Sequence, residues 1–258
     1  MTAPRTVLEA VLGCRSNSSH APNISDKSSD QSVAISIRLL DLLDLLHDPQ
    51  GPDGFRIAAA EGQGAGTELE RIVRADLELE LATLAPNRGW QVRQPGRPVK
   101  EFAQYSHLGE LDRAIDADIT RVLATTIGRD YQVEPDITIG EELHFEPLPM
   151  LHASVSCKLT LRSDRAQNIR LEAATLIRYR RGRLPHIVAV TAEPLPTRLA
   201  SIAAGTGEID AVFHIALPEL MQSVEEVGNV VQTNALEELI SQRRLRPYSE
   251  LARQLVSS

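Results

Sequence analysis

Apolar residues recur at helical spacing in several long segments of the chain. Residues 33–47 and 67–85 carry an apolar side chain every three or four positions, which predicts two amphipathic helices, the second with Glu70 in its first turn. The same spacing predicts further helices over residues 109–127, 165–181, 217–242 and 247–256. Ser163 or Asp164 is the expected N-cap of the helix over 165–181, and Gly182 its expected C-cap.

Between these helices lie segments that read as strands, over residues 131–139, 152–161, 186–192 and 209–215. Residues 152–161 show strict alternation: His152, Ser154, Ser156 and Lys158 are expected on one face of a half-buried strand, with apolar residues on the other. Strands that alternate with helices predict an α/β fold in which helices flank a central mixed β-sheet.

Length and composition favour one folded unit. We expect residues 1–258 to form a single domain, in which 130–200 is the catalytic and recognition core and the polar segment 15–32 is a loop that contacts the ligand. Only Cys14 and Cys157 are present, so a reducing compartment is favoured over a disulfide framework. The chain start lacks a secretory signal and no window approaches a membrane span, so we expect a cytoplasmic protein without membrane association.

The charge of the chain is unevenly distributed. Its formal net charge is −8, yet residues 162–183 contain seven arginines against only Asp164 and Glu172. Such asymmetry is typical of a protein that presents one basic face to a polyanion and gathers carboxylates nearby. A solvated arginine-rich helix would give the same pattern.

The segment that runs from Pro135 to Glu172 carries the groups that phosphodiester hydrolysis needs. A divalent metal held by carboxylates can activate water and neutralise charge on the phosphate. Asp136 would hold the metal, and Lys158 would orient the water or meet charge on the phosphate. Glu172 shares a helical face with apolar residues, so its carboxylate is expected to point inward at the sheet.

Each of these residues also has an ordinary structural interpretation. Asp136 fits a turn at a strand end, Lys158 an exposed strand lysine, and Glu172 a surface acid or an ion-pair partner of Arg165 or Arg170. Glu70 could simply favour a helix N-terminus through the helix dipole. The order of the residues along the strands and helix therefore argues more strongly than any one of them.

Arg162, Asp164 and Arg165 lie where the strand ends and the helix begins, a place that can enter a DNA major groove. Arginine binds guanine O6 and N7 through two hydrogen bonds and aspartate accepts from cytosine N4, so the triplet fits G·C pairs. The alternative is a capping aspartate between solvated arginines. The seven histidines show no zinc-site spacing, and the glycine-rich segments 62–66 and 203–207 lack the lysine of a phosphate loop.

As a group, these residues resemble the NgoMIV-type restriction endonucleases of the PD-(D/E)xK nuclease superfamily. The resemblance is carried most closely by the runs Met150–Lys158, Arg162–Asn168, Gly182–His186, Val190–Pro194 and Gly205–Asp210. It extends more loosely upstream through Gly62-Gln63, Leu69-Glu70 and Pro135-Asp136. It implies a restriction-endonuclease-like fold.

The resemblance also implies roles for individual residues. The metal, Mg²⁺ with two ions per site, would be held directly by Asp136 and the backbone carbonyl of Cys157, and through water by Glu172 and Glu70. Ser156 stands where most of the superfamily has an acid, and Glu172 from the following helix would replace that acid. Base contacts of the family fall on Arg162, Asp164 and Arg165 for the inner CCGG, on Arg198 for the outer pair, on Gln63 in the minor groove, and on Asp26 and Ser28 in the N-terminal loop.

The function that follows is a type II restriction endonuclease that cleaves double-stranded DNA at GCCGGC, before the first C, leaving a 5′ overhang with 5′-phosphate ends. Its expected partners are a second copy or three further copies of the chain, as a homodimer or a dimer of dimers, and a cognate DNA methyltransferase. Two alternatives stay open from the residues alone: a repair or structure-specific nuclease of the same superfamily, and a DNA-binding regulator that has lost catalysis.

Overall fold

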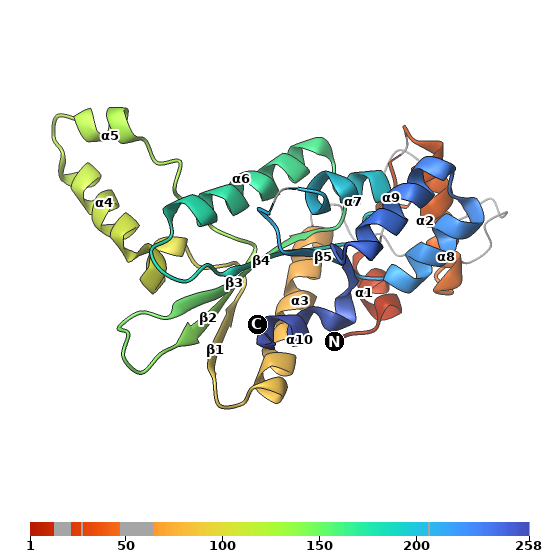
Figure 1. The fold of residues 1–258 in the computed structure, drawn as a ribbon, viewed down its shortest axis with the longest axis horizontal. Coiled ribbons are helices and arrows are strands. Elements are labelled where there is room, and N and C mark those ends of the chain that lie inside the picture. The colour runs from red at the N-terminus through yellow and green to blue at the C-terminus, as the bar shows by residue number, and fades with distance from the viewer. Residues whose placement is uncertain (13–21, 27, 47–63, 206, 258) are drawn as a thin grey trace.

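A computed structural model describes residues 1–12, 22–26, 28–46, 64–205 and 207–257. One six-stranded sheet, with order β1-β2-β3-β4-β5-β6, runs through the molecule (Figure 1). Its strands are β1 (Gly89–Arg93), β2 (Ile137–Glu142), β3 (Met150–Lys158), β4 (His186–Thr191), β5 (Ala211–His214) and β6 (Leu245–Pro247). The pairs β1/β2 and β2/β3 are antiparallel, and β3 to β6 are parallel. The prediction of an α/β fold with a central mixed sheet is confirmed.

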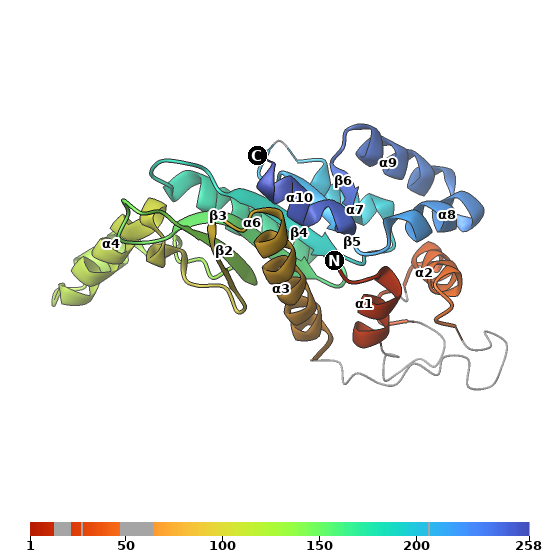
Figure 2. The ribbon, with the colours of Figure 1, turned by 90° about the horizontal axis from the view of Figure 1, so that it is seen from below.

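Helices cover both faces of the sheet. The longer helices are α1 (Pro4–Val11), α2 (Asp30–Leu42), α3 (Gly64–Leu84), α4 (Ser106–Ala117), α6 (Ser163–Tyr179), α7 (Pro196–Ala203), α8 (Leu217–Val227) and α9 (Val230–Ser241). The short ones are α5 (Val122–Ile127), α10 (Leu251–Val256) and the 3-10 turns η1 (Val99–Glu101), η2 (Ala103–Tyr105) and η3 (Tyr248–Glu250). Helices α3 and α10 lie on one face and α6 on the other (Figures 1 and 2). None of the helices in the described ranges has the length and apolar character that crossing a bilayer requires.

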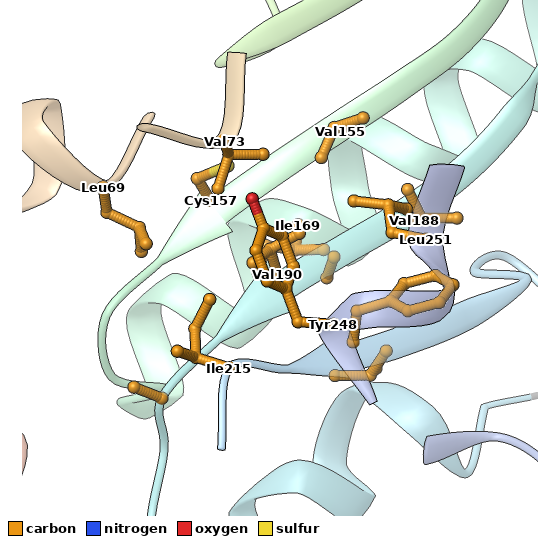
Figure 3. Close-up of a cluster of buried hydrophobic side chains, with 14 of the residues drawn as sticks. Leu69, Val73, Val155, Cys157, Ile169, Val188, Val190, Ile215, Tyr248 and Leu251 are labelled. Carbon is orange, nitrogen blue, oxygen red and sulfur yellow. The ribbon is translucent and has the colours of Figure 1, made fainter. Parts of the chain in front are cut away.

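Tyr248 packs at the centre of the core between α3 and the sheet. Its ring lies among Leu69 and Val73 of α3 and the β3 side chains Val155 and Cys157 (Figure 3). Its hydroxyl donates to Asp76 Oδ2 at 2.9 Å, and burial is the main cause that raises the tyrosine pKa far above its usual value. The buried hydroxyl therefore has the partner that its burial demands.

The strand over residues 152–161 is present as β3, but it is not half-buried. Ser154 and Ser156 are as buried as the apolar residues between them, because helices lie on both faces of the sheet. A bulge also interrupts the β2/β3 pairing, where Ala153 faces Ile139 but Leu151 faces Gly140. His152 is the extra residue, and its Nε2 lies 2.7 Å from the Leu255 carbonyl of α10. The extra residue breaks the regular alternation of side chains, so the prediction that His152 shares the face of Ser156 and Lys158 is wrong.

Several predicted boundaries are wrong. β2 begins after Pro135-Asp136 rather than containing them, because the Pro135 and Asp136 carbonyls both accept from Gly96 N–H instead of joining a strand ladder. The helix over 109–127 is divided into α4 and α5, since the Asp118 carboxylate accepts from the Thr120 and Leu123 amides and starts a new helix.

Helix α6 also begins and ends earlier than predicted. Arg162 occupies its N-cap position without a side-chain cap, and Ser163 and Asp164 lie inside the first turn. The helix stops at Tyr179, where Arg180 is already extended, so Gly182 is not its C-cap. Strands β1 and β6 and helices α1 and α7 were not predicted. Each strand has five residues or fewer and each helix has eight, and β1 shows neither clear alternation nor a continuous apolar run.

Candidate active site

Asp136 and Lys158 meet at one end of the antiparallel pair β2/β3. Ile137 pairs with Val155, so the residue before β2 faces the last residues of β3. Oδ2 of Asp136 accepts a hydrogen bond from Lys158 Nζ at 2.6 Å and another from the Cys157 backbone N–H at 2.8 Å. Both side chains are partly exposed, at 20% for the aspartate and 26% for the lysine. Lys158 is therefore not a solvated strand lysine.

The loop after β1 holds the Pro135-Asp136 segment in place. The Gly96 N–H donates to the carbonyls of Pro135 and Asp136, both at 3.0 Å, and Arg97 N–H donates to Thr138 Oγ1 at 3.1 Å. A Cβ at position 96 would lie 2.2 Å from the Pro135 carbonyl oxygen, so only glycine permits this approach. Sequence reasoning missed this loop, although its Gln-Pro-Gly triplet is a turn signal.

Glu70 and Glu172 lie on helices that cover opposite faces of the sheet, and the charge of Asp136 acts on both of them (Figures 1 and 2). Glu70 comes from α3 and Glu172 from α6. Burial is the main cause that raises the pKa of Glu172; the charge of Asp136 raises this pKa further, and Lys158 lowers it. Burial likewise raises the pKa of Glu70, against the hydrogen bond that Gln94 Nε2 donates to its Oε2 at 3.2 Å. The inward orientation predicted for Glu172 agrees with this influence of Asp136.

Two structural interpretations of the glutamates are now excluded. Helix α3 already runs at Gly64, so Glu70 lies beyond the first turn, where the helix dipole has lost most of its effect. Within the described part of the chain, Glu172 forms no ion pair with Arg165 or Arg170; Arg170 instead pairs with Glu208, and Arg165 donates to Thr160. Gln94 is a further group at this site that sequence reasoning missed.

The acids converge without forming a closed ligand set. No three His, Cys, Asp or Glu side chains among the described residues are close enough to coordinate one ion together. Oδ1 of Asp136 accepts no hydrogen bond from the described residues, and Glu70 and Glu172 are further acids influenced by the same carboxylate. Partly buried carboxylates with raised pKa values would be relieved by a cation, and oxygen donors suit Mg²⁺. The residues therefore fit a hard divalent ion, with some ligands acting through water.

Ser156 and Cys157 are consecutive residues near the end of β3, so their side chains point to opposite faces of the sheet. The Cys157 thiol is buried in the core, and burial is the main cause that raises its pKa well above the usual value, so it is not a nucleophile. The main chain of Cys157 is more informative. In a strand the N–H and C=O of a residue point to the same edge, so the Cys157 carbonyl faces the edge on which Asp136 lies.

The residues expected to read bases follow closely after Lys158 in the chain. Arg162 and Asp164 are exposed, and neither side chain pairs with a group in the described ranges. Arg165 is half-buried, and its guanidinium donates to Thr160 Oγ1 at 3.0 Å. Arg162 and Asp164 are thus presented to solvent, whereas Arg165 is hydrogen-bonded to Thr160 in the preceding loop.

Asp26 and Arg198, 172 positions apart, form an ion pair. Asp26 Oδ1 also accepts from the Ser28 hydroxyl at 2.7 Å and from the Ser28 N–H at 2.9 Å. The Ser28 hydroxyl is the main cause that lowers the pKa of Asp26 to about 2, and Arg198 adds to it. The structure therefore brings together three of the predicted contact residues. Gln63 lies outside the described residues.

Comparison with known proteins shows the family of the chain. A family model described as NgoMIV restriction enzyme matches residues 4–147 and 144–256. The type II restriction enzyme NgoMIV of Neisseria gonorrhoeae is 37% identical over 221 residues, which cover 74% of this chain and 77% of that protein. A solved complex of restriction endonuclease PspGI with substrate DNA aligns at 12% identity over 87% of this chain and 90% of its own, with a TM-score of 0.30. The chain belongs to the NgoMIV restriction enzyme family and is a type II restriction endonuclease.

Proposed function

We propose that this enzyme hydrolyses double-stranded DNA at GCCGGC, before the first C, with Mg²⁺ as cofactor and with 5′ overhangs and 5′-phosphate ends as products. The observation that carries the chemistry is the double contact of Asp136 Oδ2 with Lys158 Nζ and Cys157 N–H, faced by two glutamates of raised pKa. A nuclease centre needs acids and a cation at one point, and these groups come from α3, β3, α6 and the residue before β2.

Asp136 would hold the metal through Oδ1, which accepts no hydrogen bond from the described residues, together with the Cys157 carbonyl at the same strand edge. Glu172 and Glu70 would complete the shell through water, and the site would take two ions. Bound Mg²⁺ would supply positive charge to the phosphate oxygens and lower the pKa of a nearby water. Ser156 occupies the strand position where most of the superfamily has an acid, and Glu172 from α6 replaces that acid.

Lys158 acts beside the acids as the fixed cation of the centre. Its ammonium group, held by Asp136, can donate to the attacking water or to a non-bridging phosphate oxygen. Because Asp136 sets its position before DNA arrives, little reorganisation is needed when charge develops. Gln94 keeps Glu70 oriented through the hydrogen bond to its carboxylate.

Arg162, Asp164 and Arg165 would read the inner CCGG from the start of α6. Arginine suits guanine and aspartate suits cytosine, and the exposure of Arg162 and Asp164 supports access to a groove. Arg198 would contact the outer pair, Asp26 and Ser28 would contribute from the N-terminal segment, and Gln63 would reach the minor groove. The ion pair that joins Asp26 to Arg198 supports a common role for these two residues.

The target sequence is palindromic, so a symmetric pair of chains can place one centre on each strand. We therefore propose a homodimer or a dimer of dimers, with residues 1–258 as a single domain. A DNA methyltransferase of the same specificity would protect the host's own sites in a restriction-modification system. Localisation in the cytoplasm stays a prediction.

Digestion of a plasmid of known sequence, followed by sequencing of the fragment ends, tests this proposal. Discrete fragments that begin with 5′-phosphorylated CCGGC are expected in Mg²⁺, and none in EDTA. A smear, or nicking that depends on DNA structure, would instead support a repair nuclease. Discrete ends at another sequence would remove GCCGGC and leave the restriction activity standing.

A further inference from the structure

The inner reader Arg162 and the outer reader Arg198 lie on different elements, and within the described ranges no hydrogen bond joins these two side chains. Arg162 follows β3, whereas Arg198 lies in α7, beyond β4. Reading adjacent base pairs requires that these side chains keep a fixed spacing, since a displacement of one ångström breaks a hydrogen bond. Some group between the two elements must therefore hold them together.

Glu193 lies at this junction and has no part in the proposed chemistry. It follows β4 and is completely buried, with 0% of its surface exposed. Its Oε2 accepts the Leu161 N–H at 2.7 Å, and its Oε1 accepts the Leu195 N–H at 3.1 Å. A carboxylate can satisfy two such donors because both of its oxygens are acceptors.

The two amides that Glu193 binds are next to the two readers. Leu161 directly precedes Arg162, and Leu195 occupies the N-cap position of α7, three residues before Arg198. The carboxylate also lies 4.0 Å from the Arg198 guanidinium, which is paired on its other side with Asp26. One buried carboxyl group thus contacts the main chain of both reader elements and faces the guanidinium of the outer reader.

The backbone of Glu193 is itself held from two sides. Its carbonyl oxygen lies 3.2 Å from His214 Nε2 on β5, and its N–H donates to Thr191 Oγ1 at 3.1 Å. The neighbouring Ala192 N–H donates to the Leu159 carbonyl at 3.2 Å, which ties the same loop to the end of β3. The side chain of Glu193 therefore extends from a rigid base.

We propose that Glu193 is a positioning residue for sequence recognition, which holds the inner reader Arg162 and the outer reader Arg198 in one register through its bonds to the Leu161 and Leu195 amides. This inference rests on the proposed function, because it needs Arg162 and Arg198 to be readers. Glu193 does not touch DNA. Its loss therefore affects inner and outer base pairs together, whereas loss of either arginine affects one set.

Glu193→Gln is the most direct test. It keeps the volume of the side chain but replaces one acceptor oxygen with an NH₂ group, so one of the two backbone N–H groups loses its acceptor. Binding of the full-length enzyme to a GCCGGC duplex, and to duplexes with one inner or one outer pair changed, is measured in Ca²⁺. We expect discrimination at both positions to fall about ten- to a hundredfold, the range that a lost bidentate base contact covers. Asp112→Asn is the matched control, because Asp112 is also buried and hydrogen-bonded but lies on α4.

Retained discrimination in a Glu193→Gln enzyme that unfolds cooperatively would overturn the inference. If that variant does not fold, Glu193→Asp keeps the charge but cannot reach both amides, and undiminished discrimination there has the same meaning. If neither folds, hydrogen exchange in the wild-type enzyme decides: cognate DNA should slow the Leu161 and Leu195 amides together, and unequal responses would count against a shared anchor. Failure of the proposed function looks different, since Arg162→Ala and Arg198→Ala would then discriminate as well as wild type.

Discussion

Lys158 Nζ lies 2.6 Å from Asp136 Oδ2, and the same oxygen accepts the Cys157 N–H. Twenty-two positions separate the two side chains in sequence, and the antiparallel register of β2 and β3 brings them together. The aspartate thus fixes the lysine's position before any substrate is present. This pair is the basis for the expectations about catalysis that follow.

Lys158→Ala should slow cleavage severely while site-specific DNA binding survives, because in the proposed mechanism the ammonium stabilises charge only as it develops on the phosphate. The expected loss in rate is about 10²- to 10³-fold or more, the usual effect of removing one such donor. Single-turnover cleavage and gel-shift binding measure the two properties separately. Lys100→Ala is the control, since Lys100 pairs with Asp112 away from the site; full cutting by the Lys158 variant would remove the lysine from the catalytic groups.

Glu172→Gln should slow cleavage by about ten- to a hundredfold, the effect typical of groups that act on a metal through a second layer. The physical reason is the loss of one of the negative charges that would hold the ion. Raising the Mg²⁺ concentration should restore part of the rate. Such a recovery is expected if the variant binds the metal more weakly, and is not expected if it only binds DNA more weakly. Glu208→Gln is the control. Glu208 pairs with Arg170, which lies on α6 like Glu172, and its loss should leave the cleavage rate unchanged.

Arg162→Ala should lose about 1–3 kcal/mol of discrimination at an inner G·C pair, the value of one bidentate base contact. Cleavage of duplexes with each inner pair changed in turn measures this quantity. Arg170→Ala, another exposed arginine of α6, should weaken no base preference. Wild-type discrimination in the Arg162 variant would exclude Arg162 as a reader.

The contribution of His152 and His214 to stability should fall as pH drops from about 6.5 to 4, because burial lowers the pKa values of both histidines to about 4. A base with a depressed folded-state pKa takes up its proton first in the unfolded chain, so each histidine contributes stability above pH 6.5 that is lost on acidification. The loss for each is on the order of 3 kcal/mol over this range.

Urea unfolding at several pH values measures this dependence. His214→Gln can keep the hydrogen bonds to the Glu193 carbonyl and the Ala216 amide, so its main effect should be a shallower slope of stability against pH. An unchanged slope would show that His214 does not supply the proton linkage.

Much of the candidate site could be predicted from the sequence, because its groups are close together along the chain or repeat at a regular period. Alternation identified β3 and placed Lys158 in it, although the strand ends at Lys158 rather than at Leu161 as predicted, and helical spacing predicted that Glu172 points inward. These inferences depend only on local geometry. The same local rules failed at the bulge of His152. A bulge depends on how two strands pair, and the sequence of one strand does not show that pairing.

The sequence by itself determined the α/β class, the order of the candidate catalytic residues and the family, since each is carried by periodicity or by contiguous motifs. Only the tertiary structure decided which distant groups meet: Gln94 with Glu70, Asp26 with Arg198, and Glu193 with the amides on either side of it. Such contacts depend on strand register, on loop path and on the burial that leaves a polar group no other partner. Those quantities are properties of the packed chain, and no short segment contains them.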